Sequence, residues 1–295
     1  MTLQLPAPPA LTHRRPFPAS EVQGPWSRWL RLASTLLMGA GLGMGAAQAQ
    51  TKPKVLDLGT AAPASAIYIG NSFFYYNNSM HGHVGRLVSE GMPGYRFRAS
   101  SATISGSGLD WHDVESYFRP KGIGTYSFDS KNNVNFNDPK NKLFDVAIMM
   151  DCSQCPIHPT LKSVFTEYAK KHSDTVRKNG GKPVFFMSWA YQDAPEMTGQ
   201  LAEAYTQAAN ENDIFVIPAG LAFARSIAEK PELNLYAADK RHPSLAGTYL
   251  AANVTYAALF KKSPVGLKYS AGLDQATATH LQNVAWATVQ AYFNP

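Results

Sequence analysis

Residues 65–90 read SAIYIGNSFFYYNNSMHGHVGRLVSE, and this stretch carries the strongest fold signal in the chain. The apolar run at 66–69 is typical of a buried strand, and a Gly-Asn-Ser sequence at 70–72 then breaks it. After an aromatic cluster, apolar side chains recur at helical spacing in residues 78–90, and Gly91 ends the run. The stretch therefore predicts a strand, a tight turn and a helix.

The rest of the chain repeats this alternation of strand and helix. Further strands are predicted at 95–102, 144–150, 184–189 and 214–217. Helices are predicted at 110–117, around 161–169 and 201–209, and at 245–260 and 274–291, with a long polar loop at 119–142. Apolar strands separated by helices imply a parallel sheet covered on both faces, because parallel neighbours need crossover connections. We therefore predict a flavodoxin-like, three-layer α/β/α sandwich around a mostly parallel five-stranded sheet.

The first 49 residues have the pattern of a signal peptide. Two arginines precede an apolar, small-residue run at 32–46, and Ala47-Gln48-Ala49 is typical of a cleavage site. No later segment offers the roughly 20 consecutive apolar residues that a membrane span requires, so none is expected after signal removal. We therefore expect an exported protein, periplasmic or secreted, in which residues 50–295 form a single domain. Arg14-Arg15 leaves a twin-arginine export route open.

Composition and charge exclude several classes of protein. The chain is 45% hydrophobic and 16% charged, which indicates a globular core rather than disorder. Its net charge is +6, and the four arginines and one glutamate of residues 1–49 leave +3 for the remainder. The lysines are scattered rather than clustered, so no nucleic-acid interface is predicted.

Both cysteines lie in Cys152-Ser153-Gln154-Cys155. In an exported protein a small-loop disulfide is one reading of this pair. Pro156 follows at once, which disfavours a thioredoxin-like redox motif, and a zinc site would need two further ligands at suitable spacing. The pair is interpreted as structural. His81 and His83 diverge on a helix and no convergent carboxylate accompanies them, so no metal site is predicted.

Candidate catalytic residues lie where loops should gather at the carboxyl ends of the parallel strands. Ser72 follows the first predicted strand and precedes a helix, so its hydroxyl can be exposed and its amide can stabilise an oxyanion. Serine needs a base, and the base needs an orienting carboxylate. Asp239 and His242, three positions apart in a predicted loop, supply both. These three residues predict a Ser-His-Asp triad.

Two blocks of the sequence resemble the SGNH/GDSL hydrolases. IGNSF at 69–73 is similar to the first block of the family's Gly-Asn-Ser-Phe branch, and DKRHPSLAGTYL at 239–250 is similar to its last block. The likeness extends from Ser65 to about Phe260. It implies the SGNH fold and a serine esterase without a cofactor, in which the three residues named above form the triad.

The resemblance also implies an oxyanion hole. Its donors would be the backbone amides of Ser72 and Gly106, with Gly108 as the alternative to Gly106. The family places an Asn after the third strand, and this chain has no Asn there. The third donor would then be Gln154 or Ser153. Alternatively, the oxyanion hole would consist of the two backbone amides alone.

A substrate pocket is predicted beside these residues, lined by Trp111, His112 and Trp189. The expected substrate is a small-molecule or glycan acyl ester. Two alternatives remain at this point, a binding protein that has the fold without the activity and an acyltransferase that uses the same serine. Neither the acyl chain nor the oligomeric state is predicted.

Overall fold

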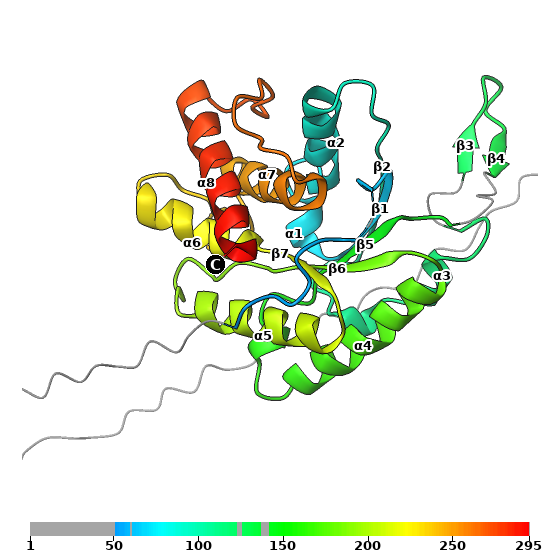
Figure 1. Cartoon of the computed structure of the whole chain (residues 1–295), viewed down its shortest axis with the longest axis horizontal. Helices are drawn as coiled ribbons and strands as arrows, with labels where there is room; N and C mark the ends of the chain where they lie inside the picture. The colour runs from blue at the N-terminus through cyan, green and yellow to red at the C-terminus, as the bar shows by residue number, and fades with distance from the viewer. Residues whose placement is uncertain (1–50, 60, 123–125, 137–141, 295) are drawn as a thin grey trace, which may run out of the picture. The chain divides into compact units, whose positions relative to one another are not determined.

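The central sheet has five strands, all parallel, in the order β2-β1-β5-β6-β7 (Figure 1). Its strands are β1 Ser65–Gly70, β2 Arg98–Thr103, β5 Val146–Met149, β6 Lys182–Phe186 and β7 Phe215–Ile217. β1 is buried along its whole length, since it pairs with β2 on one side and with β5 on the other. This position places the residues after β1 in the middle of the sheet's carboxyl edge.

The structure is a computed structural model that describes residues 51–294 except 60, 123–125 and 137–141. All described residues belong to the unit Gln48–Pro295. The predicted signal peptide, residues 1–49, lies outside the described part. Within that part, no helix is long and apolar enough to cross a membrane.

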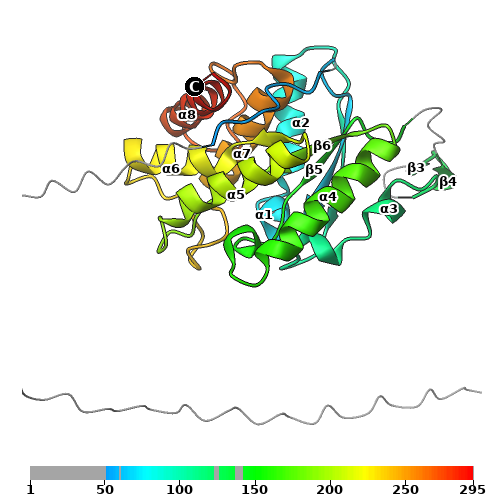
Figure 2. The same ribbon diagram turned by 60° about the horizontal axis from the view of Figure 1, so that its bottom comes forward.

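Helices cover both faces of the sheet (Figures 1 and 2). Along β1, Ala66 and Tyr68 pack with one set of helices, and Ile67 and Ile69 pack with the other, because successive side chains of a strand point to opposite faces. The first set is α2 Met80–Gly91, α6 Ala219–Glu229, α7 Leu245–Phe260 and α8 Gln275–Phe293. The second set is α3 Val114–Tyr117, α4 Lys162–Lys178 and α5 Met197–Glu211. The predicted three-layer α/β/α sandwich is confirmed.

Three segments differ from the prediction. The segment predicted as a loop, 119–142, contains an antiparallel hairpin of β3 Tyr126–Phe128 and β4 Val134–Phe136. Each strand has only two apolar residues around one polar residue, a signal too short to stand out in a polar stretch. α6 was not predicted, and the predicted helix at 110–117 is a 3₁₀ turn, Leu109–Trp111, followed by the short α3.

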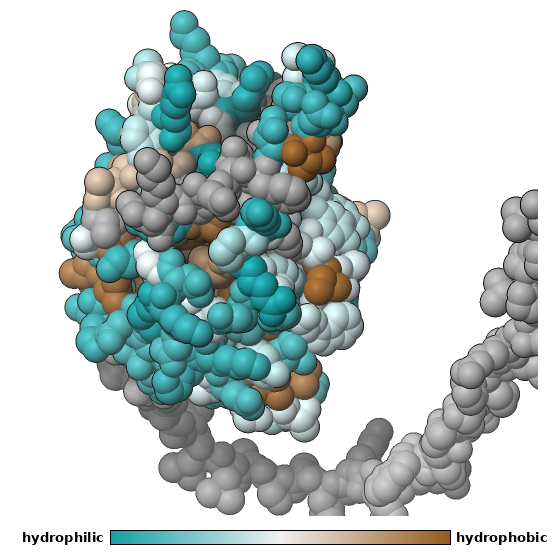
Figure 3. Space-filling view, turned by 90° about the vertical axis from the view of Figure 1, so that its right-hand side faces the viewer, coloured by the Kyte–Doolittle hydropathy of each residue, from teal (hydrophilic) through white to brown (hydrophobic). Residues whose placement is uncertain are grey.

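The hairpin exposes Tyr126, Phe128 and Val134. Figure 3 shows a face of the molecule on which the hydrophobic residues that can be seen lie in small groups among hydrophilic ones. Hydrophobic side chains scattered in this way are ordinary for a protein surface.

Candidate active site

Ser72 is the first residue of the short helix α1, Ser72–Tyr75, directly beyond the carboxyl end of β1. Asn71 caps this helix in an extended conformation, and its side-chain oxygen accepts from the Phe73 amide at 3.2 Å. The Ser72 amide lies in the first helical turn and has no intrahelical acceptor. The strand, turn and helix predicted from residues 65–90 therefore present at the same point a serine hydroxyl and an amide that no other described residue accepts from.

His242 links this serine to the other predicted residue, Asp239. Its Nε2 lies 2.7 Å from Ser72 Oγ, although the two residues are 170 positions apart in sequence. Its Nδ1 forms a short hydrogen bond with Asp239 Oδ2. This bond is the main reason that the pKa of Asp239 is lowered to about 2, so the carboxylate is ionised at neutral pH. The three side chains form one continuous hydrogen-bonded line.

The loop that carries Asp239 and His242 is closed by its own backbone. The Ala237 amide donates to the His242 carbonyl at 2.8 Å, and Lys240 adopts a left-handed conformation with φ of 63°. Asp239 Oδ1 accepts from the Arg241 and His242 amides, each at 3.0 Å. A carboxylate three residues before the imidazole is thereby fixed by the same turn that fixes the imidazole.

Asn77 and Trp189 attach this loop to the rest of the site. Asn77 Nδ2 donates to the Pro243 carbonyl at 3.0 Å, and Trp189 Nε1 donates to the Arg241 carbonyl at 3.0 Å. The Trp189 ring is fully buried and stacks on Phe73 at 4.6 Å. The prediction that Trp189 faces the substrate is wrong, because neighbouring rings cover the indole. The indole N–H instead supports the loop that carries Asp239 and His242.

We expect Trp189→Ala to lower the free energy of unfolding by about 3–5 kcal/mol, the usual cost of removing a large buried aromatic ring. Urea denaturation followed by circular dichroism measures this change. Trp111→Ala is the matched control, because Trp111 is 59% exposed and its loss should change the free energy by less than about 0.5 kcal/mol. Equal effects of the two substitutions would contradict the support role of Trp189.

His112 also differs from its predicted role. It is buried, with Nε2 3.0 Å from Ser107 Oγ and Nδ1 3.0 Å from the Tyr117 hydroxyl. Burial lowers the pKa of His112 to about 4, so the ring is neutral at neutral pH. His112 thus holds the turn that carries Ser107 and does not line an open pocket. Trp111 is exposed, and no hydrogen bond or ring contact among the described residues joins it to the triad.

The turn after β2 carries both glycines considered for the oxyanion hole. Gly106 has a left-handed φ of 69°, which suits glycine, and the following Ser107 amide donates back to the Ile104 carbonyl at 3.2 Å. Within the described residues, neither the Gly106 nor the Gly108 amide has a protein acceptor. Both therefore remain available as donors.

The segment after β5 holds the residues considered for the third donor. Gln154 is exposed, and its side chain makes no hydrogen bond to another described residue. Ser153 Oγ is 2.6 Å from the Tyr191 hydroxyl. Cys152 and Cys155 form a disulfide, the small-loop pairing that the sequence left open.

Sequence reasoning missed an aromatic neighbour of the triad. Tyr76 stacks on the His242 ring with a centroid distance of 4.2 Å and an interplanar angle of 9°. Phe73 meets the same ring edge-on at 5.5 Å. Both belong to the four consecutive aromatic residues after Ser72. The sequence therefore shows an aromatic cluster here but does not show that it packs on His242. These rings restrict the imidazole to the plane in which it reaches Ser72 and Asp239.

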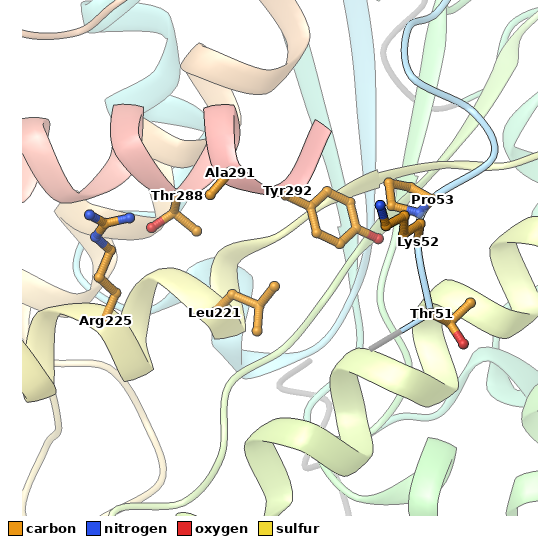
Figure 4. A pocket seen from close by; sticks show the side chains of 8 residues that line it. All are labelled: Thr51, Lys52, Pro53, Leu221, Arg225, Thr288, Ala291 and Tyr292. Carbon is orange, nitrogen blue, oxygen red and sulfur yellow. The ribbon is translucent and has the colours of Figure 1, made fainter. Parts of the chain in front are cut away.

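A pocket of about 340 Å³ lies elsewhere, between the segment Thr51–Pro53 and helices α6 and α8 (Figure 4). Its lining includes Arg225 and Tyr292 but none of the triad residues. Among the described residues, no group of three or more His, Cys, Asp or Glu side chains is placed to hold a metal ion. The candidate active site is therefore the carboxyl edge of the sheet around Ser72.

Solved structures share this fold at low sequence identity. A DUF4886 family protein from Bacteroides uniformis has a TM-score of 0.54 and 18% identity over 76% of this chain and 94% of its own. A protein from Parabacteroides merdae described as a GDSL-like lipase has a TM-score of 0.50 and 12% identity, over 70% and 99%. An acetylxylan esterase from Geobacillus stearothermophilus has a TM-score of 0.49 and 13% identity, over 68% and 95%.

The chain has the fold of the SGNH/GDSL hydrolases. The resemblance of its first and last sequence blocks to that family is confirmed at the level of the fold. No protein-family model and no curated protein matches the sequence. Activity therefore has to be argued from the geometry around Ser72.

Proposed function

We propose that the protein is an exported serine ester hydrolase in which Ser72, His242 and Asp239 form a catalytic triad. The observation that carries this proposal is the 2.7 Å separation of Ser72 Oγ and His242 Nε2, together with the bond from His242 to Asp239. This is the arrangement that acyl transfer by a serine requires, namely a nucleophile, a base and an orienting carboxylate in hydrogen-bond reach.

In the first step, His242 Nε2 removes the hydroxyl proton of Ser72 while Oγ attacks the ester carbonyl carbon. The carbonyl electron pair moves to oxygen, and the amides of Ser72 and Gly106, or of Gly108, receive the resulting oxyanion. When the carbonyl re-forms, the alcohol leaves and takes the proton from His242. The ionised Asp239 stabilises the imidazolium throughout this step.

In the second step, water replaces the alcohol. His242 accepts a proton from water, and the hydroxyl oxygen attacks the carbonyl carbon of the acyl-enzyme. Collapse of the second tetrahedral intermediate breaks the bond to Ser72 Oγ, which regains the proton from His242. The products are a carboxylic acid and the free enzyme. No step requires a group beyond this chain and water.

The proposed substrate is a small-molecule or glycan acyl ester that reaches Ser72 at the carboxyl edge of the sheet. Export to the periplasm or the medium is part of the proposal. The signal pattern in residues 1–49 and the Cys152–Cys155 disulfide support it, since disulfides persist in oxidising compartments.

A fluorophosphonate probe tests the nucleophile directly. We expect the probe to label the wild-type protein at Ser72 and to leave Ser72→Ala unlabelled, because only a serine activated by a base attacks phosphorus rapidly. Mass spectrometry of the labelled peptide identifies the site. If the wild type is folded but takes up no probe, a binding role without hydrolysis replaces the enzyme. An added alcohol or sugar acceptor that diverts the acyl group from water would indicate an acyltransferase.

A further inference from the structure

Asp151 is a buried carboxyl group beside the nucleophile that the mechanism above does not use. It lies two residues beyond the end of β5 and is 2% exposed. Its Oδ1 accepts from the Leu109 amide and from the Cys152 amide, each at 2.8 Å. Asp151 therefore connects the loop after β5 with the loop that follows β2.

Asn71 joins the same two loops to the nucleophile. Its Nδ2 donates to the Ser107 carbonyl at 3.0 Å and to the Asp151 carbonyl at 3.1 Å. Because Asn71 directly precedes Ser72, the serine, the glycine turn and the end of β5 share one hydrogen-bonded network. The Asp151 side chain contacts this turn at Gly108 and Leu109, and the His112 side chain contacts it at Ser107.

The Asp151 carboxylate lies directly against the backbone of Gly108. A Cβ atom on Gly108 would lie 2.8 Å from Asp151 Oδ1 and 2.6 Å from Asp110 Oδ1, which no side chain could accept without movement. The glycine turn is therefore placed by contact as well as by hydrogen bonds. A side chain at position 108 would require both carboxylates to shift.

The environment of Asp151 disfavours its charge. Burial, with a smaller contribution from Asp110, raises the pKa of Asp151 to about 6. Among the described residues, no Lys or Arg forms an ion pair with it. A buried carboxyl group whose ionisation is disfavoured and which lies next to the candidate active site is a candidate for a role in that site.

We propose that Asp151 is a positioning residue that holds the turn of Gly106 and Gly108 against Ser72, so that the amides of this turn meet the oxyanion. The inference rests on the proposed esterase function. The acceptor oxygen of Asp151 performs this task, and its charge is not required. Asparagine preserves that oxygen, whereas alanine leaves the Leu109 amide without its acceptor.

The test compares Asp151→Ala and Asp151→Asn in the full protein with p-nitrophenyl acetate as substrate. Asp151→Ala should lower kcat by about 100-fold, the typical cost of displacing a catalytic group by an ångström. KM should stay within about threefold, because the ground-state ester does not use the oxyanion donors. Asp151→Asn should keep kcat within about threefold of the wild type.

A phenylboronic acid and thermal unfolding give two readouts besides turnover. The tetrahedral boronate adduct on Ser72 mimics the oxyanion, so its affinity should fall in Asp151→Ala in parallel with kcat. Because the folded-state pKa of Asp151 is raised above 3.8, its ionisation lowers stability above about pH 6, and this cost disappears below pH 4. Asp151→Asn should therefore raise Tm at pH 8 and leave it unchanged at pH 4.

The wild type and Ser72→Ala are assayed alongside. Equal rates for these two proteins would show that the esterase function itself is wrong, and the inference would fall with it. An active wild type with an equally active, folded Asp151→Ala would overturn only the positioning role. Equal losses of kcat in Asp151→Ala and Asp151→Asn would also overturn it, since the charge rather than the acceptor would then be needed. If Asp151→Ala does not fold, the test uses Asp151→Asn. Values of kcat and boronate affinity near those of the wild type are then the expected result, and a parallel loss of both would overturn the positioning role.

Discussion

Replacement of His242 by alanine is expected to lower kcat for ester hydrolysis by about five to six decades. The Ser72 hydroxyl is 2.7 Å from His242 Nε2, and the structure places no other described ring nitrogen or carboxylate in a hydrogen bond with that hydroxyl. Without the imidazole the serine has no base, and losses of this size follow removal of the base in serine hydrolases. Hydrolysis of p-nitrophenyl acetate by the purified variant measures the change.

His158→Ala is the control for this prediction, because His158 is an exposed histidine whose hydrogen bonds are to Thr160 and to local backbone. It should keep the wild-type kcat within about twofold. The double variant Ser72→Ala/His242→Ala should be no less active than either single variant, since the two residues act as a unit. If His242→Ala kept more than a hundredth of the wild-type kcat, the triad assignment would be wrong.

The sequence predicted the sheet and the meeting of Ser72, His242 and Asp239 for the same physical reason. Both depend on short local patterns whose consequences are fixed by the topology of parallel sheets. An apolar run that ends at Gly70 places Ser72 at the carboxyl edge of the sheet. Asp239 and His242 are three residues apart, so a single loop brings them together. Once the loop and the strand meet at that edge, the hydrogen bond between His242 and Ser72 follows.

The pocket residues could not be predicted, because their burial depends on partners that are distant in sequence. Trp189 follows β6, and from the sequence alone its side chain could face either solvent or the core. It is buried because Phe73 and Phe223 stack on its ring. His112 is likewise satisfied by Ser107 and buried. Large aromatic residues after a strand are therefore weak indicators of a substrate wall.

The role of Asp151 was also missed, although the residue stands in the block where the family's Asn is absent. An oxyanion hole is recognised in a sequence by side chains that can donate, and a carboxylate does not donate. In the structure Asp151 accepts from the Leu109 amide, and its proposed positioning of the glycine turn rests on this bond. A side chain that positions an oxyanion-hole amide by accepting a hydrogen bond therefore cannot be found by looking for residues that donate.

A second large effect is expected from Asp239→Asn, which should lower kcat by about four decades. In the native loop, Asp239 Oδ1 accepts from two amides, those of Arg241 and His242, and Oδ2 faces His242 Nδ1. The asparagine oxygen has to take the position that accepts both amides, so its NH₂ group faces Nδ1. His242 must then carry its proton on Nε2, the nitrogen that should accept the proton of Ser72.

The pH range of this effect follows from the lowered pKa of Asp239. Because that pKa is about 2 and below the ordinary 3.8, the interaction with His242 favours the carboxylate, is complete above about pH 4 and is lost as pH falls through 2. The loss of kcat in Asp239→Asn should therefore be constant from pH 6 to 9. Asp193→Asn is the control, since Asp193 Oδ2 lies 3.9 Å from Arg241 Nη1 and, among the described residues, forms no hydrogen bond or ion pair with His242. A loss of less than tenfold in Asp239→Asn would mean that the carboxylate does not set the proton position of His242.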